Sequence, residues 1–197
     1  MRSYLRPYSA APRPEHVTVP ATNYVVIDRH VLAESADAFR TAVTLDVLST
    51  AIHARLREQS GLQYLVFPLE GVWHLLDSDV GFSRPENIQG RMMTKQPFEL
   101  SSESLSHVKA ECIKNSEGRE LVDYLAAATL EPVESHEVVQ MLHVGPYSDE
   151  PSTFATMNEF ARVNGLNRRA DAHREVYLKD VRHGPPDAFE TILRVSV

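Results

Sequence analysis

The chain has 197 residues, of which 43% are hydrophobic and 24% charged, a size that suits one ordinary domain or two small ones. Its 27 Asp and Glu residues outnumber its 20 Lys and Arg residues, so the formal net charge is -7. Binding to nucleic acid requires a basic surface that displaces counterions from phosphate, so this charge argues against nucleic acid and acidic membranes as partners. The single cysteine, Cys112, excludes an internal disulfide and a paired-cysteine metal site.

The N-terminal segment contains no continuous apolar stretch, and nowhere does an uncharged apolar run reach the roughly 20 residues that span a bilayer. We therefore predict no signal peptide, no membrane contact and a cytoplasmic location. Prolines at positions 7, 12, 14 and 20 hold the first residues extended. Residues 1–22 are thus predicted to form an extended arm over the surface.

Hydrophobic spacing divides the rest of the chain into two halves with the same order of elements. In the first half it predicts a strand, a helix ended by Gly61 and two further strands, over residues 23–28, 37–58, 62–67 and 88–95. Residues 69–76 are expected to be extended but too irregular for a standard strand. A capped helix over 101–114 and an acidic, alanine-rich insertion over 115–135 follow.

The second half begins with a predicted strand and a Gly-Pro turn, over residues 137–144 and 145–146. A helix with Pro151 in its first turn and a Gly165 cap comes next. The last two predicted strands cover residues 172–178 and 191–197. Each half reads strand, helix, strand, strand.

We therefore predict an α+β fold of duplicated β-α-β-β modules, with antiparallel sheets, helices on one face and a ligand cleft between the modules. Residues 23–197 are expected to form one domain. Its first module would cover about 23–100, a connecting helix and insertion about 101–136, and its second module about 137–197.

Several familiar catalytic motifs are absent from the sequence: no G-x-G-x-x-G, P-loop, G-x-S-x-G or H-E-x-x-H occurs. The nine histidines include no pair three to five residues apart, the spacing that places two metal ligands on one helix. We therefore expect no metal site.

The most informative segment is HREVYL, near the C-terminus. Residues two apart on a strand share a face, so His173, Glu175 and Tyr177 should lie on one side. The apolar Val176 and Leu178 are expected to face the helices, which would turn Glu175 and Tyr177 toward the cleft. Alternatively, Glu175 points into water from an open sheet face.

The first half offers a comparable segment, PLEGVW, in which Glu70 and Gly71 precede the only tryptophan, Trp73. A glycine here suggests a bulge, or the close approach of another backbone or a ligand. A core tryptophan beside a turn explains the pattern equally well. Tyr147 follows a Gly-Pro turn, a place where functional residues are often presented, although it can also simply pack over the turn. Tyr64 is a further candidate for lining the cleft.

If these groups converge, two kinds of chemistry become possible. A carboxyl group walled by aromatic rings loses hydration, which raises its pKa from about 4.3 toward neutrality. It can then transfer a proton, an effect of about 10²–10⁴ in rate. The same carboxyl group, if ionised, would instead hold a lipophilic cation by charge and cation–π attraction.

These segments also carry a family resemblance that spans nearly the whole chain. The GyrI-like small-molecule-binding domain family is similar to this sequence at residues 23–28, 67–73, 92–97, 141–166, 173–182 and 191–195. The resemblance implies a pseudo-symmetric pair of β-α-β-β modules with a ligand cleft between them, in agreement with the duplication described above.

Stand-alone members of this size resemble cyclopropanoid cyclopropyl hydrolases, which open the cyclopropane of spirocyclopropyl-cyclohexadienone DNA alkylators by adding water. The resemblance implies that Glu175 activates or orients water, or relays a proton to the dienone oxygen. It implies that Tyr147 is a possible proton donor. The expected substrate-binding residues are Trp73, Tyr177, Tyr64 and Glu70. The resemblance implies no metal or organic cofactor, because ring strain supplies much of the driving force.

Two positions depart from the family pattern. Arg29-His30-Val31 replaces a Gly-rich turn after the first strand, and His74 replaces a second aromatic residue after the tryptophan. We expect a hydrolase acting on strained planar xenobiotics, with a role in detoxification and drug resistance. A non-catalytic binder of hydrophobic or cationic drugs is the alternative, and a gyrase modulator is less favoured. Because only residues 1–23 precede the first strand, we do not expect a transcription regulator.

Overall fold

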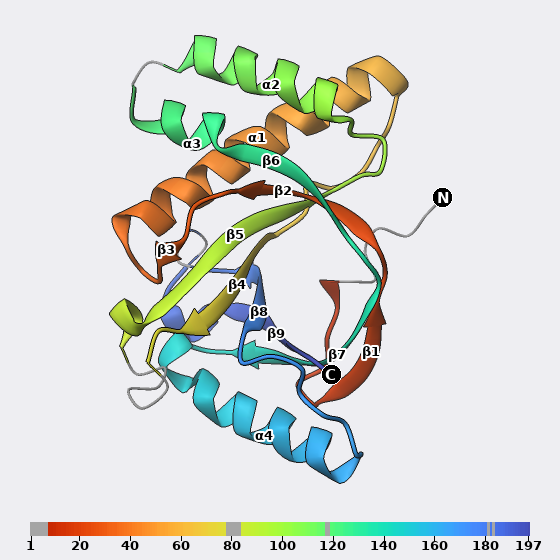
Figure 1. The fold of residues 1–197 in the computed structure, drawn as a ribbon, viewed down its shortest axis with the longest axis vertical. Helices are drawn as coiled ribbons and strands as arrows, with labels where there is room; N and C mark the ends of the chain where they lie inside the picture. Colours follow the sequence, from red (N-terminus) through yellow and green to blue (C-terminus); the bar gives the residue numbers. More distant parts are fainter. Residues whose placement is uncertain (1–7, 78–83, 117–118, 181, 183) are drawn as a thin grey trace.

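One antiparallel sheet with four helices makes up the fold in the computed structural model, which describes residues 8–77, 84–116, 119–180, 182 and 184–197 (Figure 1). The strands are β1 (Glu15–Val19), β2 (Thr22–Ile27), β3 (Val31–Leu32), β4 (Leu69–Leu75), β5 (Ile88–Gln96), β6 (Ala128–Val133), β7 (His136–Val144), β8 (His173–Lys179) and β9 (Glu190–Ser196). Their order is β1-β7-β9-β8-β4-β5-β2-β6, and β3 pairs with β5. The predicted α+β class is confirmed.

The helices are α1 (Ala36–Ser60), α2 (Ser102–Asn115), α3 (Val122–Ala126) and α4 (Glu150–Val163). The Ser35 side chain accepts a hydrogen bond from the Ala38 amide at the start of α1, and Gly61 ends the helix in the left-handed conformation at φ 68°. No helix in the described part of the chain is long and apolar enough to cross a membrane.

The two halves of the chain meet at the centre of the sheet. The segment β2-α1-β4-β5 has the same order of elements as β7-α4-β8-β9, and β4 pairs with β8 so that Gly71 lies opposite Glu175. The predicted strand–helix–strand–strand order is therefore present twice, but the strands form one continuous sheet. Glu175 occupies the strand pair at which the halves join.

Two segments, β1–β2 and β6–β7, connect the two ends of the sheet. Only residues 20–21 separate β1 from β2, and only residues 134–135 separate β6 from β7. Because β1 pairs with β7 while β2 pairs with β6, the segments form a ribbon along one side of the curled sheet (Figure 1). Part of the predicted arm is thus the strand β1, and the predicted insertion contains α3 and β6.

The two sheet faces are both buried, which matters for the site. On the helix face, α1 packs in a core that contains Val25, Trp73 and Tyr177, and α4 packs against Val139 and Leu193. On the opposite side, which we call the inner face, Tyr24, Val26 and Met93 form a separate buried cluster. The helices therefore share one face of the sheet, as predicted.

Two expectations about strands are wrong. Residues 62–67 form no strand, and Leu65 and Val66 are exposed. Both sides of β5 are already paired, one with β4 and the other with β2 and β3, so no position beside β5 is left for this segment. Residues 69–75, expected to be too irregular, form the central strand β4, whose backbone pairs with both β5 and β8.

The predicted orientation of β8 relative to the helices is also wrong. Glu175 and Tyr177 do share a face, but it is the helix face, since Tyr177 packs in the α1 core and Glu175 pairs with Leu193 under α4. Val176 points to the inner face, where it is fully buried beside Glu70. Because the curl of the sheet buries both faces, an apolar side chain does not distinguish the helix face from the inner face.

Candidate functional site

Three aromatic side chains meet on the helix face at the join between the modules. The Trp73 Nε1–H of β4 donates a hydrogen bond of 2.6 Å to the hydroxyl of Tyr177 on β8. Tyr147, in the short 3-10 turn η5 (Tyr147–Asp149), lies edge-on to Tyr177 with ring centroids 6.1 Å apart. We call Trp73, Tyr147 and Tyr177 the aromatic wall.

A cluster of two acids and one histidine lies against this wall. His173 Nε2 lies 2.7 Å from Oε1 of Glu175, two residues along the same face of β8. Glu150, the first residue of α4, lies beside both, and one donor atom from each of the three residues lies within 4.8 Å of the others. Glu150 and Glu175 expose only 7% and 8% of their surface. We call Glu150, His173 and Glu175 the acid cluster.

Burial decides where the proton lies in this cluster. Loss of hydration, followed by the charge of Glu175 and the hydrogen bond to it, raises the pKa of Glu150 to about 10. Burial is also the main reason that the pKa values of Tyr147 and Tyr177 are raised, with the charge of Glu175 second. Glu150 and both tyrosines are therefore protonated at neutral pH, and all three lie beside Glu175.

The same three residues offer ligands for a metal ion. One donor atom from each of Glu150, His173 and Glu175 lies within 4.8 Å of the others. Carboxylate and imidazole are ligands that zinc and iron accept. The histidine spacing that argued against a metal concerned pairs on one helix, whereas this set combines a strand with a helix end.

The site is almost closed to solvent. Trp73 and Tyr177 are 4% and 7% exposed, whereas Tyr147 is half-buried and is the outermost ring of the wall. Tyr147 also contacts Phe189, with ring centroids 5.2 Å apart, and the Gly145 amide donates to the Phe189 carbonyl. A ligand that reaches Glu175 would have to displace Tyr147 or Phe189.

The structure brings four of the six sequence-predicted residues together, namely Glu175, Tyr147, Trp73 and Tyr177. Glu70 lies on the inner face instead, where it is fully buried and accepts hydrogen bonds from Tyr8, Tyr24 and Arg174. Tyr64 packs on His53 of α1 and on Phe67, away from Glu175.

Glu150 is the member of the site that the sequence did not indicate. An acidic residue in the first turn of a helix is common, because it interacts favourably with the helix dipole, so its position carries no functional signal. His173 was placed correctly on the Glu175 face by strand alternation. Only the packing of α4 over β8 brings Glu150 close to His173 and Glu175.

The comparison with protein families supports a ligand-binding role for this region. Residues 128–197 match the model of the GyrI-like small molecule binding domain. This segment contains the acid cluster and two members of the aromatic wall. The predicted relationship to this family is therefore confirmed over these residues.

Solved structures with the same fold cover nearly the whole chain. A hydrolase from Listeria innocua has a TM-score of 0.80 at 24% identity and covers 96% of this chain and 94% of its own. An uncharacterized conserved protein from Listeria innocua has a TM-score of 0.85 at 24% identity, with coverages of 98% and 96%. The EcmrR C-terminal domain is more distant, with a TM-score of 0.53 at 10% identity and coverages of 93% and 96%. At such identities the likeness shows the fold alone. No curated protein matches the sequence.

Proposed function

We propose that this chain is a small-molecule hydrolase that adds water to the strained cyclopropane of planar electrophiles such as spirocyclopropyl-cyclohexadienones. The observation that carries the proposal is that the carboxyl groups of Glu150 and Glu175 lie together, with donor atoms within 4.8 Å, beside three aromatic side chains. Such a site offers a proton acceptor, a proton donor and flat apolar walls for a planar substrate.

The reaction would proceed by one displacement. A water oxygen bonds to a cyclopropane CH₂ carbon while Glu175 accepts the water proton. The bond from that carbon to the spiro carbon breaks, and its electron pair enters the ring, which becomes an aromatic phenolate. Glu150 gives its proton to the phenolate oxygen, and Glu175 then passes the proton it took from water to the neighbouring Glu150. Burial beside Glu175 raises the pKa of Glu150, so Glu150 holds its proton until a basic phenolate oxygen develops beside it.

The other predicted residues would position the substrate. Tyr147 keeps its proton, because burial raises its pKa, and can donate a hydrogen bond to the dienone oxygen. Trp73 and Tyr177 supply the flat surface, held in place by their mutual hydrogen bond. We place this activity in the cytoplasm, where it would detoxify an alkylator before the alkylator reaches DNA. Two Listeria innocua proteins of the same fold are described as hydrolases, which agrees with the proposal but concerns the fold only.

The decisive experiment measures turnover. The protein is incubated with a spirocyclopropyl-cyclohexadienone, and mass spectrometry follows the product that is heavier by one water. We expect Glu175→Gln to lower the rate by about 10²-fold or more, as for the loss of a general base. Glu159→Gln, which removes an exposed carboxylate from the same helix as Glu150, is the matched control and should leave the rate unchanged.

Three further measurements make the result unambiguous. Circular dichroism checks that Glu175→Gln is folded. Tyr147→Phe, at a half-buried position, should lower the rate less than Glu175→Gln does. A chelator should have no effect, and a loss of rate that zinc or iron restores would assign the acid cluster to a metal instead. An unchanged rate in folded Glu175→Gln would refute the proposed role of this residue.

A non-catalytic binder is the second candidate, favoured by the same carboxylate beside aromatic rings. Quenching of Trp73 fluorescence by a triarylmethane dye cation would detect such binding. Binding that Glu175→Gln weakens, without any turnover of the cyclopropane, would replace the hydrolase proposal with sequestration.

A further inference from the structure

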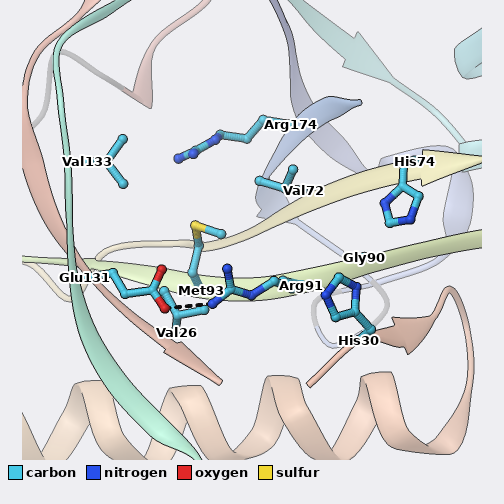
Figure 2. Close-up of a pocket in the computed structure, with 10 residues that line it drawn as sticks. All are labelled: Val26, His30, Val72, His74, Gly90, Arg91, Met93, Glu131, Val133 and Arg174. Atoms are coloured by element: carbon cyan, nitrogen blue, oxygen red, sulfur yellow. Dashed lines mark hydrogen bonds and ion pairs between the residues drawn. The ribbon is translucent and has the colours of Figure 1, made fainter. Parts of the chain in front are cut away.

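A pocket of about 260 Å³ opens on the inner face, on the other side of the sheet from the acid cluster (Figure 2). Its apolar surface comes from Val26, Val72, Met93 and Val133. Its volume is just below the 300–1,000 Å³ typical of ligand sites, so it suits a molecule smaller than most drugs. Arg174 borders this pocket, whereas its chain neighbour Glu175 points to the opposite face.

Two arginines contribute the polar part of the lining. Arg91 Nη2 lies 2.7 Å from Oε1 of Glu131 and 3.5 Å from Oδ1 of Asp28, while its Nε–H is buried with no hydrogen-bond partner among the described residues. Arg174 Nη1 lies 3.0 Å from Oε2 of Glu70. Figure 2 shows Arg174 extending over the pocket toward Val133, and Arg91 beside Met93. Both guanidinium groups therefore border the same space.

Positive charge exceeds negative charge in and beside this pocket. Arg174 on β8 lies directly opposite Arg194 on β9, and like charges at such positions repel each other. Lys95, two residues from Met93 on the same face of β5, is 6% exposed, and burial lowers its pKa. These three cations and Arg91 are accompanied there by the carboxylates of Asp28, Glu70 and Glu131. Cations therefore outnumber carboxylates around this pocket, although the net charge of the protein is -7.

The two departures from the family pattern lie at the other end of the pocket. The rings of His30 and His74 are edge-on, with centroids 6.1 Å apart, beside Gly90 (Figure 2). These imidazole rings offer faces and edges against which an aromatic ring of a ligand can pack.

We propose that the inner-face pocket is a second small-molecule site, which binds a small aromatic carboxylate. The ring of the ligand packs between the valines and Met93, and its carboxylate contacts Arg91 and Arg174. Arginine is the side chain best suited to this task, because its planar group matches a carboxylate with two parallel hydrogen bonds. The site is independent of the proposed hydrolase activity.

Three probes of one shape test the charge of the ligand: benzoate, benzamide and benzylamine. Binding is followed in methyl spectra of protein carrying ¹³C-labelled methionine, because Met93 lines the pocket and Met157 lies in the core under α4. We expect benzoate to shift the Met93 signal and to bind at least tenfold more tightly than the other two. No shift of Met93, or equal binding of benzylamine, would overturn the proposal.

Variants then test the position of the ligand. Arg91→Gln should weaken benzoate binding about tenfold and change benzamide binding little, since the released Glu131 is partly exposed and can be hydrated. Arg162→Gln, on the exposed side of α4, is the matched control. Val133→Phe should fill the pocket and abolish binding of all three probes. Benzoate binding that survives both Arg91→Gln and Val133→Phe would contradict the assignment.

Discussion

Two glutamates on opposite faces of the sheet illustrate how neighbours decide the state of a buried acid. Glu70 is surrounded by the guanidinium of Arg174 and two tyrosine hydroxyls, which compensate a carboxylate charge. Glu150 instead meets another carboxylate, that of Glu175, in a nearly dry site. Loss of hydration and the nearby charge of Glu175 both disfavour a second charge there, so Glu150 keeps its proton.

This proton makes the stability of the protein depend on pH. Folding takes up a proton between the ordinary pKa of Glu150, 4.5, and its raised value of about 10, so stability falls as the pH rises through that range. Glu150→Gln retains a donor but cannot ionise. We therefore expect the unfolding free energy of Glu150→Gln, minus that of the natural chain, to increase with pH. The increase should be up to about 1.4 kcal/mol per pH unit between pH 5 and 9.

Urea unfolding at several pH values measures this effect. Glu159→Gln, which changes an exposed acid on the same helix, should show the same pH dependence as the natural chain. Parallel stability curves for Glu150→Gln and the natural chain would show that Glu150 ionises normally.

The strand pair β4–β5 accommodates one large side chain, that of Trp73, beside two glycines, Gly71 on β4 and Gly90 on β5. Trp73 lies flat over Gly71, and on β5 it is paired with Gly90. A Cβ at Gly71 would overlap the Trp73 indole nitrogen and touch the Tyr177 hydroxyl. The sequence suggested a bulge, or the approach of another backbone or a ligand, at this glycine; the structure instead places the tryptophan side chain of the same strand there. The glycines let the indole lie against the sheet where it can reach Tyr177.

Gly71→Ala should therefore push the indole away and break the Trp73–Tyr177 hydrogen bond. We expect a loss of about 1–3 kcal/mol in stability, as for overpacking, with a changed emission of the single tryptophan. Fluorescence and thermal unfolding measure both. Gly184→Ala adds a methyl group in open space and serves as the control. Equal behaviour of the two variants would mean that Gly71 is not needed for this packing.

At the scale of the whole molecule, the N-terminal segment completes the inner face. The hydroxyl of Tyr8 donates to Glu70 at 2.8 Å, and the carbonyls of Ser9 and Ala11 accept hydrogen bonds from Gln140 and Leu142 of β7. Residues near the start of the chain thus contact strands from both halves. The segment is therefore attached to the sheet by hydrogen bonds, although its described residues are half-buried or exposed.

Removing one hydroxyl tests this role. We expect Tyr8→Phe to lower the unfolding free energy by about 1–3 kcal/mol, because the buried Glu70 loses a donor. Tyr124→Phe removes a tyrosine hydroxyl that bonds the exposed Asp37, and should cost less. Equal losses in urea unfolding would show that the Tyr8–Glu70 contact has no special weight.

Local patterns in the sequence predicted a large part of this arrangement. Spacing and caps predicted α1 and its end at Gly61, and strand alternation placed His173, Glu175 and Tyr177 together. The apolar run over 62–67 was a misleading pattern, because β-propensity does not show whether a sheet has a free position for the strand.

The helices, most of the strands and the side chains that share a face could be predicted, since they follow from spacing of two or 3.6 residues along the chain. Which face of β8 the helices cover depends on the packing of the whole sheet, because the curled sheet buries both faces and hydrophobicity then distinguishes neither. The tertiary structure also decided that Glu150 meets Glu175 and that Glu70 does not, since these contacts depend on how α4 and the inner face pack.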